Sequence, residues 1–259
     1  MIPTSLTQLQ PMLLTLMLAM LRPGAALLAA PIFGASAIPV QVRVILALAV
    51  GVPASSAAHF DGSMDAILSV GGIVMMMGEV VLGLALGFAL QIGFAVALIA
   101  GESIGSAMGL GFASMNDPAS GHSSTAIGQF LNLLAGVLFL CSGGHLALIE
   151  IVMGSFRSLP PGVSWLTPQA LHGLADFGGL MFAAGATVAL PVVSVLILVQ
   201  IAMAVVTRAA PALNLFAVGI PVTVLAGLGL MALAVPVLAM AIEHALDLGL
   251  DQARVIAGL

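Results

Sequence analysis

The chain has 259 residues, of which 61% are hydrophobic and 6% are charged, and its mean hydropathy is +1.26. In an ordinary soluble domain about a quarter of the residues are charged. The composition of this chain therefore excludes a water-soluble fold and predicts an integral membrane protein. The chain has five Arg, no Lys and a net charge of −5. It therefore cannot form the basic surface that binds a phosphate backbone, which excludes nucleic acid as a partner.

The N-terminal apolar stretch ends in Ala35-Ser36-Ala37, which is similar to the cleavage site of a signal peptide. A signal peptide needs a basic region before its apolar run, whereas the first basic residue here, Arg22, lies inside the run. We therefore expect no cleavage.

Six apolar runs are long enough to cross a hydrocarbon layer of about 30 Å, which takes roughly 20 helical residues. Their apolar residues do not alternate with polar ones, so a membrane barrel is excluded and the predicted fold class is all-α. The linkers are short and rich in turn-forming residues, which predicts one helical membrane domain, residues 1–259, with a weak subdivision before a final helical hairpin. The predicted segments are 9–31, 37–56, 66–100, 125–153, 178–206 and 213–241.

Two of these segments are unusual for simple membrane spans. Residues 66–100 would form a helix of roughly 52 Å, so this segment must tilt, break or protrude. The first segment is interrupted by Arg22-Pro23-Gly24, which predicts a helix break whose polar groups contact other protein. Because the Arg residues divide equally between the two sides that six spans create, the orientation stays undecided.

Glycines recur at four-residue spacing, which places them on one face of a helix. In a membrane such faces let two helix backbones approach closely. The face either packs within this chain or contacts other subunits, and the sequence favours the second interpretation because the pattern continues into a polar, irregular stretch. The glycines are Gly83 and Gly87, followed by Gly101, Gly105 and Gly109.

Two carboxylates, Glu79 and Glu102, interrupt apolar runs. A carboxylate at membrane depth is costly and normally faces protein or water, so both positions are predicted to be interior. A proton relay is disfavoured because the two residues are 23 positions apart. We expect the carboxylates to accept hydrogen bonds from helix ends or from neighbouring subunits.

The sequence has none of the motifs that indicate an enzyme or a cofactor site. There is no HExxH and no Walker loop, and Pro118-Ala119-Ser120-Gly121 lacks the first glycine of an intramembrane serine protease motif. The five histidines have no ligand spacing, and Cys141 is the only cysteine. We therefore predict no enzymatic activity, no metal and no cofactor.

Several motifs, in their order and spacing along nearly the whole chain, resemble the FliR family of flagellar type III export proteins and its virulence-secretion homologues. One departure is Ala212, where the family pattern has Gln. The motifs are residues 101–118, Arg22-x-Gly24 with Pro31-x-Phe33-Gly34, Gly143-Gly144-His145, residues 155–162 and residues 208–221.

The resemblance implies a subunit that assembles with FliP and FliQ into a closed channel in the inner membrane, at the flagellar basal body. FlhA and FlhB would be further partners in the export apparatus, membrane lipid would surround it, and unfolded flagellar proteins would pass through it. Residues 1–174 would be a FliP-like part and residues 175–259 a FliQ-like hairpin. The alternatives are the homologous subunit of a virulence secretion system and, from a different class, a secondary transporter.

The resemblance also assigns roles to individual residues. The stretch after the glycine face corresponds to a plug that seals the channel, in which bulky apolar side chains exclude ions and glycines let the backbone bend. The plug residues would be Gly109, Leu110, Gly111, Phe112, Met115, Asp117 and Pro118. The buried polar or structural positions would be Arg22, Glu79, Glu102, Arg208, Pro211 and Asn214.

Overall fold

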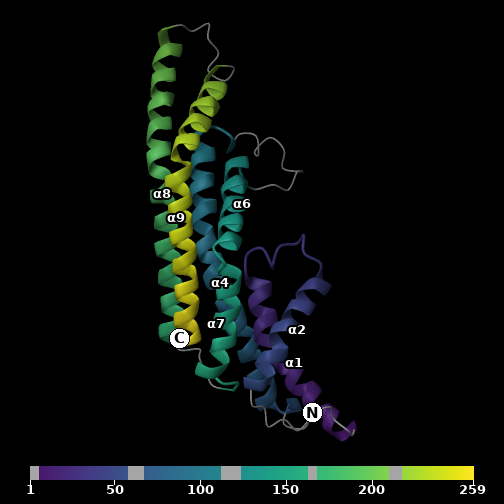
Figure 1. Cartoon of the computed structure of the whole chain (residues 1–259). Coiled ribbons are helices and arrows are strands. Elements are labelled where there is room, and N and C mark those ends of the chain that lie inside the picture. The colour runs from purple at the N-terminus through teal and green to yellow at the C-terminus, as the bar shows by residue number, and fades with distance from the viewer. Residues whose placement is uncertain (1–5, 58–66, 112–123, 163–167, 210–217) are drawn as a thin grey trace. The chain divides into compact units, whose positions relative to one another are not determined.

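The computed structural model describes residues 6–57, 67–111, 124–162, 168–209 and 218–259, and the regular elements within these ranges are all helices (Figure 1). The prediction of an all-α fold is confirmed. The helices are α1 (Leu6–Ala29), α2 (Val40–Ala57), α4 (Val70–Ala107), α6 (Ala126–Cys141), α7 (Gly144–Ser158), α8 (Pro168–Ala209) and α9 (Ile220–Ala257).

Four of these helices are long and apolar enough to cross a membrane, and a fifth span is possible if α6 and α7 count as one bent span. The sequence predicted about six apolar helical segments. The difference includes α2, whose apolar part, Val40–Ser56, is shorter than a full span.

The long predicted segment is a single helix, because α4 continues without a break for 38 residues. At 1.5 Å per residue its length is about 57 Å. The predicted break at Arg22-Pro23-Gly24 is wrong, because α1 continues through Pro23 to Ala29. A proline removes only one backbone donor, and in a membrane protein neighbouring helices can stabilise such a position.

The predicted segment 125–153 is divided into α6 and α7, which meet at a bend of 67°. Gly143 lies at this bend with φ of 76°, a left-handed conformation that costs glycine little because it has no Cβ. The last two helices are longer than predicted, since α8 has 42 residues and α9 has 38. Their additional turns carry polar residues that a search for apolar runs does not count.

The chain divides into two compact units. Unit 1 contains residues 1–93, 142–177 and 247–259, and unit 2 contains residues 94–141 and 178–246. The subdivision predicted at residue 174 stays a prediction.

In unit 1, α1 packs against α2 and α7, and its backbone lies close to α4. A Cβ on Gly83 would overlap the carbonyl oxygen of Arg22, and a Cβ on Gly87 would overlap the carbonyl oxygen of Ala26. Only glycine lets these two helices approach so closely.

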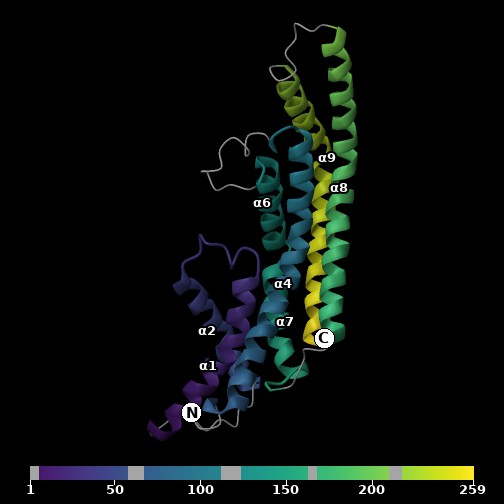
Figure 2. The same cartoon turned by 180° about the vertical axis from the view of Figure 1, so that it is seen from behind.

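In unit 2, the end of α4 packs with α6, α8 and α9. The rings of Phe94 on α4 and Phe139 on α6 meet edge to face, with centroids 5.5 Å apart. The two last helices, α8 and α9, run alongside each other in both views (Figures 1 and 2). Their outward faces keep many large apolar side chains exposed, among them Leu180, Phe182, Leu198, Leu225 and Leu233.

Candidate functional site

The C-terminal end of α4 closes with a turn at Gly109, the first residue of the predicted plug. Gly109 has φ of 84°, the N–H of Gly109 donates to the carbonyl of Ser106 at 3.0 Å, and the N–H of Leu110 donates to the carbonyl of Gly105 at 3.0 Å. This pair of hydrogen bonds is the Schellman arrangement that ends many helices. The turn therefore fixes where α4 stops, and the plug residues Leu110 and Gly111 follow it.

Side chains from two other helices cap the end of α4. Gln200 on α8 donates from Nε2 to the carbonyl of Ala107 at 2.6 Å. The hydroxyl of Thr223 on α9 lies 3.0 Å from the carbonyl oxygen of Met108. A Cβ on Gly227 of α9 would come within 2.6 Å of the Met108 side chain, so α9 passes very close to this point.

Gly101 and Gly105 of the predicted glycine face pack within unit 2, against the start of α6. A Cβ on Gly101 would lie 2.6 Å from the Cα atom of Gly128, and a Cβ on Gly105 would overlap the side chain of Thr125. This part of the face therefore makes an internal helix contact, one of the two interpretations that the sequence left open.

The carboxylate of Glu102 caps the N-terminus of α6. Its Oε1 accepts a hydrogen bond from the backbone N–H of Thr125 at 2.8 Å, while the hydroxyl of Thr125 accepts one from the N–H of Gly128 at 3.0 Å. In an ordinary capping box a Glu three residues after the Thr would make the first bond. Here that position is Gly128, where a Cβ would overlap Glu102 Oε1, and the carboxylate comes from α4.

In unit 1, Arg22 and Glu79 form a buried ion pair. Arg22 Nε lies 2.9 Å from Glu79 Oε2 and Nη2 lies 3.0 Å from Oε1. Arg22 is 1% exposed and Glu79 is 4% exposed. Such a pair is stable away from water only when further hydrogen bonds satisfy the charged groups.

Helix α7 supplies these further contacts to Arg22. The guanidinium donates from Nη1 to the hydroxyl of Ser155 at 2.9 Å and from Nη2 to the carbonyl of Leu159 at 2.9 Å. Its carbon Cζ lies 4.1 Å from the centre of the Phe156 ring. Since Leu159 is the C-terminal cap of α7, Arg22 also places a positive charge where the helix dipole is negative.

The structure does not place the remaining predicted site residues in these hydrogen-bonded groups. The side chain of Arg208 is exposed near the end of α8, so the described part of the chain does not provide its expected burial. Six predicted residues lie outside the described residues, namely Phe112, Met115, Asp117, Pro118, Pro211 and Asn214.

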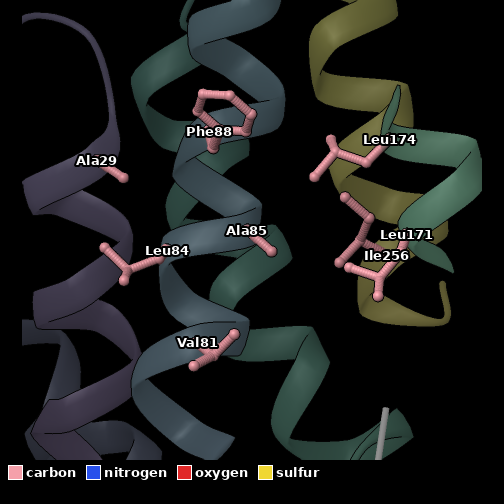
Figure 3. Close-up of a pocket in the computed structure, with 8 residues that line it drawn as sticks. All are labelled: Ala29, Val81, Leu84, Ala85, Phe88, Leu171, Leu174 and Ile256. Atoms are coloured by element: carbon pink, nitrogen blue, oxygen red, sulfur yellow. The ribbon is translucent and has the colours of Figure 1, made fainter. Parts of the chain in front are cut away.

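Unit 1 also contains an apolar pocket of about 280 Å³ (Figure 3). The lining side chains come from α1, α4, α8 and α9, and all of them are hydrocarbon. A pocket of this kind can hold apolar groups but offers no polar atom to orient a reacting substrate. The residues are Ala29, Val81, Leu84, Ala85, Phe88, Leu171, Leu174 and Ile256.

Across the described ranges, no group of three or more His, Cys, Asp or Glu residues is placed to hold a metal ion. The polar side chains at the end of α4, at the N-terminus of α6 and around Arg22 instead form hydrogen bonds with other protein groups. The arrangement therefore holds helices in position.

Sequence reasoning did not find the partners Gln200, Thr223, Thr125 and Ser155. Gln200 carried a usable signal, because a polar amide inside an apolar span needs a partner. Thr125 carried another, because it directly precedes a predicted helix. Neither signal names the partner helix.

Comparison with known proteins gives one consistent result. The family model described as bacterial export proteins, family 1, matches residues 13–249. The flagellar biosynthetic protein FliR of Pectobacterium carotovorum is 35% identical over 215 residues, covering 83% of this chain and 82% of the relative. FliR of Escherichia coli K12 is 34% identical and covers 87% and 85%. FliR of Bacillus subtilis is 26% identical and covers 94% of both.

Proposed function

Because the chain belongs to family 1 of the bacterial export proteins, together with flagellar FliR, we propose that it is a non-enzymatic subunit of the flagellar export gate, assembling with FliP and FliQ into a closed channel. Its membership of the flagellar protein export apparatus, in the inner membrane at the basal body, follows from the family and from the membrane-spanning helices. The family match over residues 13–249 is the observation that carries the proposal.

The outward faces of α8 and α9 support a subunit role. A helix in a membrane exposes apolar side chains either to lipid or to other helices. Gly178, Gly179 and Gly229 lie on these two helices, and a Cβ at any of them would meet no atom within 4 Å. Small residues with room beside them allow a partner helix to approach closely.

The proposed plug starts at the end of α4. Gly109 turns the chain out of the helix, and Leu110 follows as the first bulky apolar side chain. In this proposal residues 109–115 of the plug form a gasket, meaning the part of the plug that excludes ions in the closed state. The gasket moves aside for an unfolded flagellar protein. FlhA and FlhB would be further partners in the export apparatus.

The first test is isolation of the tagged chain from its host membranes in mild detergent, with the copurifying proteins identified by mass spectrometry. We expect FliP and FliQ in one large complex. A monomer or a simple homodimer, under conditions that keep other membrane complexes intact, would contradict the assembly.

The second test addresses the gasket. Deletion of residues 109–115 should make vesicles that contain the assembled complex permeable to ions, while the same complex without the deletion stays tight. If both complexes are equally tight, the gasket role is wrong even though the subunit role stands.

A further inference from the structure

We propose that Gln200 and Thr223 are positioning residues of the gasket, because they hold the end of α4 from which the gasket segment starts. The inference rests on the proposed function and adds two residues to it. Both residues act through α4 and are not expected to touch the exported protein. All the atoms involved belong to unit 2.

The last four carbonyl groups of a regular helix such as α4 have no donor within the helix. The backbone of the glycine turn satisfies three of them, since Ile104, Ser106 and Gly105 accept from the N–H groups of the next residues, Met108, Gly109 and Leu110. The fourth carbonyl, that of Ala107, accepts from Gln200. The Gln200 side chain on α8 therefore supplies the one donor that the backbone at the end of α4 lacks.

The position of Gln200 gives a second reason. It lies inside the apolar span Leu171–Ala209, and its side chain is exposed. A polar amide facing a hydrocarbon layer is costly unless its groups are paired. The hydrogen bond to Ala107 reduces that cost and ties α8 to α4 at this point.

Thr223 acts one residue further along. Thr223 is 6% exposed. Its hydroxyl lies 3.0 Å from the Met108 carbonyl, 3.1 Å from that of Gly219 and 2.9 Å from that of Ile220. A hydroxyl has one proton, so these acceptors share it. Met108 is itself fully buried and packs against Gly227, so the hydrogen bond and the packing hold the same residue.

Together the two caps attach residues 107 and 108 to α8 and α9, immediately before the left-handed turn at Gly109. The gasket then starts from a fixed point. A gasket that starts from a loosely held helix end would occupy a range of positions and would seal the channel poorly.

The experiment uses the assembled complex in vesicles and compares Gln200→Leu, Thr223→Val and the double variant with the parent. Thr223→Ser keeps the hydroxyl and serves as the rescue. Thr187→Val is the matched control, because the hydroxyl of Thr187 donates only to its own helix, to the carbonyl of Ala183 at 2.8 Å. The deletion of residues 109–115 is measured in parallel.

Two readouts are taken from each complex: ion leakage, and amide hydrogen exchange at residues 108–110. We expect each cap variant to exchange about fivefold faster there, which corresponds to the loss of one hydrogen bond, and to leak more than the parent. Thr223→Ser and Thr187→Val should behave like the parent. Because the Gln200 side chain is exposed, Gln200→Leu keeps the test decisive if Thr223→Val fails to assemble.

If the deletion leaks while the cap variants stay tight and exchange at the parent rate, the positioning role is overturned and the gasket role stands. If the deletion stays tight, the gasket role fails and the positioning role fails with it. Faster exchange and leakage in Gln200→Leu and Thr223→Val, together with leakage in the deletion and parent behaviour in Thr223→Ser and Thr187→Val, support the inference.

Discussion

Arg22 on α1 and Glu79 on α4 are 57 residues apart in the sequence and form a two-point ion pair, with both N–O distances at 2.9 to 3.0 Å. The pair is almost completely buried, and α7 contributes two more acceptors to the same guanidinium. Three helices of unit 1 are therefore held by one arginine. Removing it leaves a carboxylate without its counterion.

Arg22→Ala should destabilise the protein by about 3 to 5 kcal/mol, because Glu79 would stay buried without its partner. Thermal unfolding in detergent measures the loss. The control is Arg254→Ala, which breaks the exposed ion pair with Asp251 and should cost less than about 1 kcal/mol. Equal losses in the two variants would contradict the role given to the buried pair.

Replacing both partners should be far less harmful than replacing one. The double variant Arg22→Met with Glu79→Leu removes both charges and keeps apolar volume, and we expect it to recover most of the stability lost in Arg22→Ala. The same unfolding measurement applies. A double variant as unstable as Arg22→Ala would show that the contacts to α7, and not the uncompensated charge, carry the effect.

Gly83→Ala and Gly87→Ala should each destabilise unit 1 by about 1 to 3 kcal/mol, because the added methyl group would overlap the backbone of α1. The matched control is Gly78→Ala on the same helix, where the added Cβ meets no atom within 4 Å. That change should be neutral or stabilising by up to about 1 kcal/mol, since alanine favours a helix over glycine. Unfolding curves of the three variants test this order.

Thr125→Ala should cost about 1 kcal/mol, because α6 loses the side-chain cap on the N–H of Gly128. Thr125→Ser keeps the hydroxyl and should lose much less. Amide exchange in the first turn of α6 is the direct measurement. If alanine and serine variants exchange alike, the hydroxyl does not cap this helix.

Gly109→Ala should cost about 1 kcal/mol, because a side chain disfavours a φ of 84°. Gly111→Ala lies two residues away and should have a smaller effect, since Gly111 does not have a positive φ and its Cβ would be 3.9 Å from the nearest atom, Ser106 Oγ. Export-dependent motility and unfolding should both rank the two variants in this order. A larger effect at Gly111 would argue against the turn as the sensitive point.

The sequence by itself determined the class of the protein. A chain with 6% charged residues cannot remain soluble, and its apolar runs have the length of membrane helices. Residues 101–118 and the other motifs sufficed to identify the export family, which the family match over residues 13–249 confirms. These properties depend on composition and on local order along the chain, so no tertiary information was needed.

The pairing of polar groups was decided only by the tertiary structure. The sequence indicated that Glu79 and Glu102 face protein or water and that helix ends or neighbouring subunits donate to them. It did not indicate that Glu79 would bind Arg22, or which helix end would meet Glu102. The caps on α4 from Gln200 and Thr223 were likewise invisible, because their residues lie 93 and 115 positions away from the carbonyls they meet. Apolar side chains determine whether a helix lies in a membrane or against other helices, and the sequence shows them directly. A hydrogen bond forms only between atoms that the packing of helices brings within about 3 Å of each other.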